Sequence, residues 1–221
     1  MYVPPQAPTC EIYPPIPRDV VVAQKPAKSK SNVFIVVDPG HGGEDFGTHS
    51  NTKPKYQEKH LNLSTARLLC SYLNKQGYKT VMTRTDDTFI SLDQRAEFAN
   101  AQKPTLFISV HYNSAPSKEA EGIEVFFYKS DDDKVRTRES RLLAKSILDK
   151  VLDNTEAKSR GVKDGNFAVI RKTDMPAVLI EGGFLTNDGE MQKIKDPNYV
   201  KKLAWGITQG ITAYLERTSK K

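Results

Sequence analysis

The sequence predicts an α/β fold: a single domain with a twisted, mostly parallel or mixed sheet of about six strands and helices on both faces. Two observations predict it. Short runs of β-branched and apolar residues recur along the chain, and they alternate with amphipathic segments of about 12 to 18 residues at helical spacing. Such alternation is typical of βαβ crossovers, which cover a sheet with helices. The length of 221 residues suits one domain of this kind.

Six runs have the length and composition of strands. The first is continuously apolar, which is the pattern of a strand buried on both faces. The expected strands are residues 32–38, 79–83, 105–110, 123–128, 167–170 and 177–180.

Helices are expected between these strands, and several have recognisable ends. Gly77 is expected to stop a helix over residues 61–73. Ser91 and Gln94 have the spacing of a capping box for the next helix, which Pro104 prevents from continuing. Two later apolar stripes predict the remaining helices, over residues 142–151 and 199–215.

The amino-terminal stretch differs in composition from the rest. Residues 1–32 contain seven of the 13 prolines and show no periodicity, so we expect a flexible or polyproline-like leader before a domain over residues 33–221. The formal net charge is +6, and the leader supplies +2 of it. Because the sequence has no recognisable nucleic-acid-binding motif, we interpret the excess as a solvated surface and expect no nucleic-acid partner.

Some classes of protein are excluded by what the chain lacks. No apolar run approaches the roughly 18 residues of a membrane helix, and the first residues do not have the pattern of an export signal. We therefore expect no membrane span. Two cysteines, Cys10 and Cys70, are too few for a cysteine zinc site or a disulfide framework. Any metal ion must be held by histidine and carboxylate.

Reactive side chains follow three of the predicted strands. His41 comes three residues after the first strand, and His111 and Glu181 directly follow the third and the sixth. Ligands of open α/β sheets bind beyond the carboxyl ends of the strands, so these side chains are expected at one edge. Glu58 ends the loop that His41 begins. A single histidine at a strand end is more often structural, but two of the chain's four histidines share this position.

Two imidazoles and one carboxylate match a catalytic zinc site, in which the fourth position is left for water. Zinc lowers the pKa of such a water to about 7. Glu181 is then expected to accept a proton during attack on a carbonyl and to return it to the leaving nitrogen, which is amide hydrolysis. Gly40, Gly42 and Gly43 are expected to let the backbone turn and to leave room for a metal and a bulky substrate beside His41.

Four ordered motifs run along residues 33–215: DPGHGGEDFG, YQEKHLNL, ISVHYNSA and NFAVIRKTDMPAVLIEGGFLTN. Together they resemble the signatures of the zinc-dependent N-acetylmuramoyl-L-alanine amidases of the amidase-3 type. The resemblance implies that Glu181 is the catalytic glutamate. It implies three metal ligands, namely His41, Glu58 and His111.

The resemblance also selects Glu58 over Glu44 as the carboxylate ligand, and Zn²⁺ over other divalent ions. It implies a peptidoglycan hydrolase that cleaves the amide between the lactyl group of N-acetylmuramic acid and L-alanine. The implied partners are the stem peptide and the glycan strand, and the implied location is the periplasm, the cell envelope or the exterior, with a role in cell-wall degradation and cell division. We expect a monomer.

Three further residues are candidates for substrate binding. By motif position, Asn113, Asn166 and Arg171 flank the cleft and could hold substrate carboxylates or amides, although surface or loop-bracing roles fit equally well. An arginine can bind a carboxylate through two hydrogen bonds, which suits an acidic stem peptide.

The resemblance raises two expectations about access to the site. Some family members carry an inserted helical segment that plugs the zinc cleft. Here residues 129–165 hold one amphipathic helix, so we expect no plug and an open site. Gly182 and Gly183 replace the usual bulkier residue and are expected to widen the cleft.

Three alternatives stay open from the sequence. Residues 50–53 match Ser-x-x-Lys, and residues 172–174 faintly resemble Lys-Thr-Gly, so an added serine D,D-carboxypeptidase activity is conceivable, although about one such match is expected by chance. A wall-binding module without catalysis would not need Glu181. A zinc peptidase or deacylase acting on another cell-wall amide would use the same residues.

Overall fold

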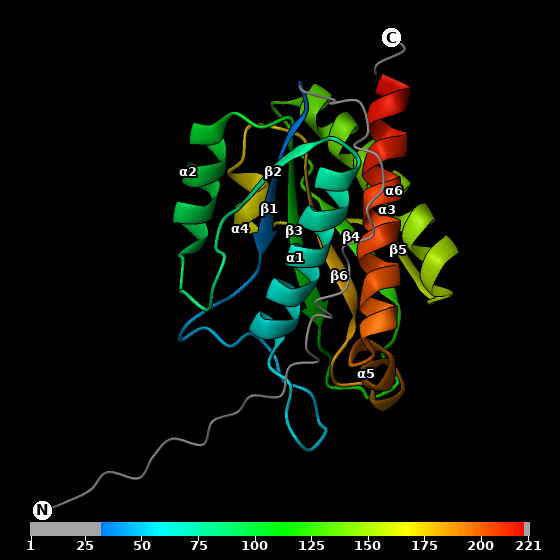
Figure 1. The fold of residues 1–221 in the computed structure, drawn as a ribbon. Helices are drawn as coiled ribbons and strands as arrows, with labels where there is room; N and C mark the ends of the chain where they lie inside the picture. Colours follow the sequence, from blue (N-terminus) through cyan, green and yellow to red (C-terminus); the bar gives the residue numbers. More distant parts are fainter. Residues whose placement is uncertain (1–31, 219–221) are drawn as a thin grey trace, which may run out of the picture.

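The structure is a computed structural model that describes residues 32–218 (Figure 1). The leader expected over residues 1–32 lies outside the described residues, apart from Asn32. Six strands form one sheet: β1 (Phe34–Pro39), β2 (Lys79–Met82), β3 (Leu106–Asn113), β4 (Ile123–Phe127), β5 (Ser159–Asp164) and β6 (Ala177–Phe184). Six helices surround it: α1 (Glu58–Lys75), α2 (Leu92–Gln102), α3 (Lys134–Thr155), α4 (Ala168–Arg171), α5 (Asp188–Ile194) and α6 (Pro197–Thr218).

The sheet is mixed, with the strand order β2-β1-β3-β6-β4-β5. The first four strands in this order run parallel to one another. Strand β4 pairs antiparallel with β6 and parallel with β5, so β4 and β5 run in the opposite direction. The carboxyl ends of four strands and the amino ends of two therefore meet at one edge. The predicted fold class is confirmed.

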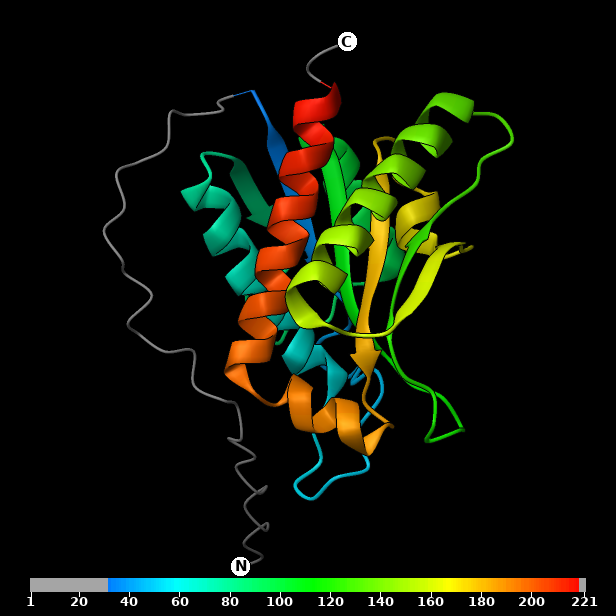
Figure 2. The same cartoon turned by 90° about the vertical axis from the view of Figure 1, so that its right-hand side faces the viewer.

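Two apolar layers hold the helices against the sheet. The larger one joins α1, α3 and α6 to one face, where α3 and α6 lie side by side (Figure 2). These two helices approach closely because Gly206 and Gly210 leave no side chain between their backbones. A Cβ at Gly210 would lie 2.4 Å from the Cα of Ile147. The smaller layer packs α2 and α4 against the opposite face.

The predicted stop of α1 and the predicted cap of α2 agree with the structure. Helix α1 stops at Lys75, and Gly77 follows in the left-handed conformation with φ of 88°. Ser91 and Gln94 form the capping box of α2 through two hydrogen bonds. Helix α1 begins at Glu58 itself, three residues before the expected start.

One predicted strand is wrong. The segment over residues 167–170 forms the short helix α4 with Phe167 as its N-cap, and the Arg171 N–H donates to the Phe167 carbonyl. Val169 and Ile170 are buried in the smaller apolar layer, and a short apolar run of this length does not distinguish a strand from a buried helical turn. The sixth strand is β5 instead. Within residues 32–218 no helix is both long and apolar enough to cross a membrane.

Candidate metal and catalytic site

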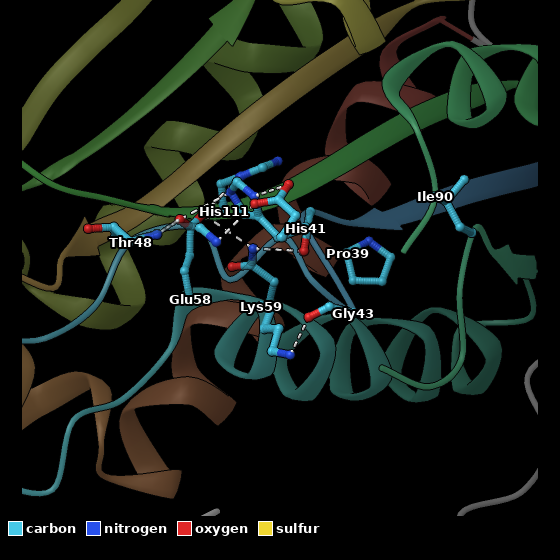
Figure 3. Close-up of polar contacts among 12 residues, drawn as sticks. Pro39, His41, Gly43, Thr48, Glu58, Lys59, Ile90 and His111 are labelled. Atoms are coloured by element: carbon cyan, nitrogen blue, oxygen red, sulfur yellow. Dashed lines mark hydrogen bonds and ion pairs between the residues drawn. The ribbon is translucent and has the colours of Figure 1, made fainter. Parts of the chain in front are cut away.

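Three side chains from separate elements converge at the edge of the sheet (Figure 3). His41 lies in the loop after β1, Glu58 is the first residue of α1, and His111 lies near the end of β3. One Glu58 oxygen is 3.1 Å from His41 Nε2, and the other is 2.9 Å from His111 Nδ1. The ligand atoms of the three residues lie within 4.8 Å of one another. The strand-end prediction thus placed both histidines correctly.

A hydrogen bond to the second nitrogen of the His41 ring fixes which nitrogen faces the shared centre. His41 Nδ1 is 2.8 Å from a carboxylate oxygen of Asp45, so Nε2 faces Glu58. The His111 ring packs against Gly40, where a Cβ would lie 2.0 Å from Cε1 and 2.2 Å from Nε2. A carboxylate behind a histidine ligand sets its tautomer and orientation, as at many metal sites. Asp45 therefore belongs to the site.

The charge of Glu58 suits a cation. Burial alone would raise the pKa of Glu58, but hydrogen bonds and charge from His111 and His41 hold it well below its ordinary value. Burial would lower the pKa of His41, yet Glu58 and Asp45 raise it. A buried carboxylate that is stabilised as an anion is a suitable ligand for a divalent ion.

Two buried arginines hold the loop that carries His41. Arg95, from α2, donates to the Asp38 carboxylate at 2.8 Å and to the His41 carbonyl at 2.7 Å. Arg84, from the loop after β2, donates through one nitrogen to the carbonyls of both Gly40 and Lys59, each at 2.8 Å. His41 has the left-handed φ of 61°, which is unfavourable for a residue with a side chain. The arginines stabilise this conformation and join the loop to the start of α1.

The glycines around His41 make room for the chain's own residues, which corrects the expectation that they leave room for a substrate. Gly40 accommodates the His111 ring, as described above. A Cβ at Gly42 would lie 2.2 Å from the Thr88 carbonyl, and one at Gly43 would lie 2.8 Å from the Phe89 backbone nitrogen. Gly42 and Gly43 also have positive φ angles. Gly42 and Gly43 therefore allow close packing against the loop before α2.

Glu181 lies beside this group on β6. It is the direct neighbour of His111 in the register of β3 and β6. Its side chain is buried, and its Oε2 has no hydrogen-bond partner among the described residues. Burial raises the pKa of Glu181 well above its ordinary value, and the carboxylates of Glu58 and Glu124 raise it further. A buried carboxyl group with a raised pKa and a free oxygen is suited to proton transfer.

Glu124 and two cations lie on the far side of Glu181, and the sequence analysis did not find them. Glu124 of β4 is the antiparallel partner of Glu181. Its carboxylate accepts hydrogen bonds from Arg160 at 2.9 Å and from Lys163 at 2.5 Å, both from β5. Asn113 donates to the other oxygen at 2.6 Å.

The three residues predicted to bind substrate do not all lie together in the structure. Asn113 bonds to Glu124 and so lies next to Glu181. Asn166 and Arg171 bond to each other at α4, on the face of the sheet that carries α2. Their role toward a substrate stays a prediction.

A cleft of about 430 Å³ opens beside the two histidines. Phe89 and Leu92 line it from the start of α2, and Val169 lines it from α4. Phe89 is 46% exposed and Leu92 is 56% exposed, so both apolar side chains are accessible from the cleft. The cleft therefore offers a substrate an apolar wall next to the candidate ligands.

Gly182 and Gly183 do not widen this cleft, so that expectation is wrong. A Cβ at Gly182 would meet Leu203 of α6 at 2.9 Å, and one at Gly183 would meet Ile194 of α5 at 3.2 Å. Successive residues of a strand face opposite sides of the sheet. Gly182 therefore faces α6, while Glu181 faces the other side of the sheet, which carries α2 and α4.

The serine alternative has a structural explanation. The Ser50 side chain is buried, accepts a hydrogen bond from the Tyr56 N–H at 2.8 Å and pairs with the Thr52 hydroxyl. These contacts stabilise the loop before α1, which accounts for the serine without a catalytic role.

The fold and the site together define a class of protein: an α/β domain with a candidate metal-dependent catalytic site at one edge of its sheet. The chain belongs to the N-acetylmuramoyl-L-alanine amidase family, whose sequence pattern matches residues 35–213.

Relatives and solved structures agree with this membership. The chain is 35% identical over 200 residues to a probable cell wall amidase LytH of Staphylococcus epidermidis, a match over 90% of this chain and 63% of the relative. The crystal structure of N-acetylmuramoyl-L-alanine amidase from Clostridium difficile 630 superposes with a TM-score of 0.79 at 40% identity, covering 84% of this chain and 98% of that one. The catalytic domain of CwlV from Bacillus (Paenibacillus) polymyxa gives 0.76 at 36%, covering 83% and 98%.

Proposed function

We propose that the chain is a zinc-dependent N-acetylmuramoyl-L-alanine amidase, whose catalytic domain spans residues 33–221. It cleaves the amide between N-acetylmuramic acid and the L-alanine of the stem peptide. The observation that carries the proposal is the convergence of His41, Glu58 and His111 beside Glu181, within a family that is named for this reaction.

The three ligand candidates fit zinc. Two imidazole nitrogens and one carboxylate oxygen are a ligand set that catalytic zinc sites use, and the three ligand atoms lie within 4.8 Å of one another. The Glu58 oxygens already lie 3.1 Å from His41 Nε2 and 2.9 Å from His111 Nδ1. When bound, zinc would polarise the scissile carbonyl and lower the pKa of a water molecule.

Glu181 performs the proton transfers. As water adds to the carbonyl carbon, the Glu181 carboxylate accepts the water proton. When the carbon–nitrogen bond breaks, the same group donates that proton to the leaving amine of L-alanine. Its free Oε2 and its position next to His111 support this role.

We propose that the site is open without an activator. The segment that could hold a plug contains α3, and α3 packs against α6 on the face opposite Glu181 (Figure 2). The enzyme would act as a monomer on wall polymer in the periplasm, the cell envelope or outside the cell. The names of its cell wall relatives support the extracytoplasmic location.

Digestion of purified peptidoglycan with and without a chelator tests the proposal. We expect free stem peptides that begin at L-alanine, identified by mass spectrometry, and their loss when zinc is removed. Peptides cut at another amide would indicate a peptidase or deacylase instead. Activity that persists after complete zinc removal would refute the metal mechanism.

A further inference from the structure

A cationic pair lies two strands beyond Glu181, at the same edge of the sheet. Arg160 and Lys163 of β5 both reach back over β4 to the carboxylate of Glu124. Glu124 is the register partner of Glu181. His111, Glu181, Glu124 and the cationic pair thus lie on β3, β6, β4 and β5, which are successive neighbours in the sheet.

A β-bulge in β5 directs the Arg160 side chain toward the carboxylate of Glu124. Ile123 pairs with Ser159 and Glu124 pairs with Gly161, so Arg160 is an extra residue between the two pairs. Gly161 has φ of 88°, and a Cβ there would meet nothing within 4 Å. Glycine is therefore present for its backbone conformation and not to make space. Bulges of this kind redirect a side chain next to a site.

The pair carries more positive charge than its partner neutralises. Glu124 provides one negative charge for two cations, and Asn113 occupies its other oxygen. The side chain of Glu124 is only 5% exposed, but those of Arg160 and Lys163 are 35% and 39% exposed. Each cation also lies over an aromatic ring: Arg160 over Phe184 and Lys163 over Phe126. Both cations are thus held in place and still accessible to an anion.

The proposed reaction indicates which part of the substrate would lie beside Arg160 and Lys163. Glu181 protonates the leaving amine, so the peptide that begins at this amine continues away from the metal side of Glu181. Neighbouring strands are about 4.8 Å apart, and two extended residues span roughly 7 Å. A carboxylate on the second residue of the peptide therefore reaches the cations above β4.

We propose that Arg160 and Lys163 form a subsite for a carboxylate on the second residue of the stem peptide. The cleft lined by Phe89 and Leu92, on the opposite side of the histidines, is then left for the sugar half. This inference rests on the proposed amidase function, because it uses the polarity of that reaction.

Matched substrates test the subsite. The substrates are two soluble muramoyl peptides that differ only in whether the second residue carries a free carboxylate or its primary amide. The zinc-loaded variant Arg160→Gln/Lys163→Gln is compared with wild type, and Lys163→Gln alone is used if the double variant unfolds. Lys145→Gln is the control, because it removes one exposed cation on α3, which packs on the other face of the sheet.

We expect KM for the carboxylate substrate to rise about tenfold in the double variant, with little change in kcat, because a charge-assisted contact is lost. The amide substrate and the control should change by less than about threefold. An equal loss on both substrates, or no loss on either, would overturn the subsite. Wild-type enzyme that cleaves neither substrate would instead contradict the amidase function itself.

Discussion

Replacing Gly40 by alanine should displace the candidate metal ligand His111 without removing it. The new Cβ would lie 2.0 Å from His111 Cε1 and 2.2 Å from Nε2, whereas ordinary contact begins at 3.4 Å. Arg84 fixes the Gly40 carbonyl, so we expect the His111 ring to move, by about 1.4 Å. That shift would break the 2.9 Å contact between His111 Nδ1 and Glu58.

Zinc ligands tolerate displacements of only about 0.2 Å, and even mutations behind the ligands cost 10- to 100-fold in affinity. We therefore expect zinc affinity to fall at least about 100-fold, with a comparable loss of kcat at a fixed zinc concentration. Competition with a chromophoric chelator measures the affinity, and thermal unfolding of the metal-free protein shows whether the variant folds. Gly189→Ala on α5 is the control, because only the Asn187 side chain lies near its Cβ, at 3.3 Å. A folded Gly40→Ala protein with wild-type zinc affinity would refute the reasoning.

Three other predictions follow from the same contacts. Glu181→Gln should bind zinc with near wild-type affinity but lose about 100- to 10,000-fold in kcat, and an active variant would mean that another group moves the proton. Asp45→Ala should weaken zinc binding about 10- to 100-fold by freeing His41 Nδ1, whereas unchanged affinity would show that this hydrogen bond does not orient the ring. Burial would raise the pKa of Asp38, but Arg95 and Thr83 lower it below its ordinary value. The charged form of Asp38 therefore stabilises the fold above about pH 4, and this contribution is lost as the pH falls further. Asp38→Asn should therefore flatten the decline of the unfolding free energy between about pH 5 and 2.5 in metal-free protein, and an unchanged slope would contradict the assignment.

The sequence predicted those parts of the fold in which burial and periodicity agree. The continuously apolar strands of the sheet centre were found, and so were the capped helices. Strand β5 was missed because its sequence, Ser-Arg-Gly-Val-Lys-Asp, is charged and only half-buried at the sheet edge and contains the glycine of a bulge. Residues 167–170 were misread because tertiary burial gave a helical turn the apolar composition of a strand.

The candidate site was predictable where side chains follow parallel strands. His41, His111 and Glu181 satisfy that rule, whereas Glu58 came from the family motif, because strand ends do not indicate where a loop returns. Arg84 was missed although it follows β2 by two residues, so the same rule could have found it. Its burial is uncommon for arginine, which is usually exposed.

Glu124 and Arg160 lie near the amino ends of their strands, and a rule about carboxyl ends could not select them. They reach the site only because β4 and β5 run opposite to the other four strands. In an all-parallel sheet, the strand next to β6 would place its carboxyl-terminal residues beside Glu181, and a loop would follow them directly. The reversed strands β4 and β5 instead place their amino-terminal residues there, and the bulge in β5 directs the Arg160 side chain toward Glu124. The same reversal therefore gives the sheet a mixed topology and places positive charge beside Glu181, on the side where the proposed reaction would release the peptide.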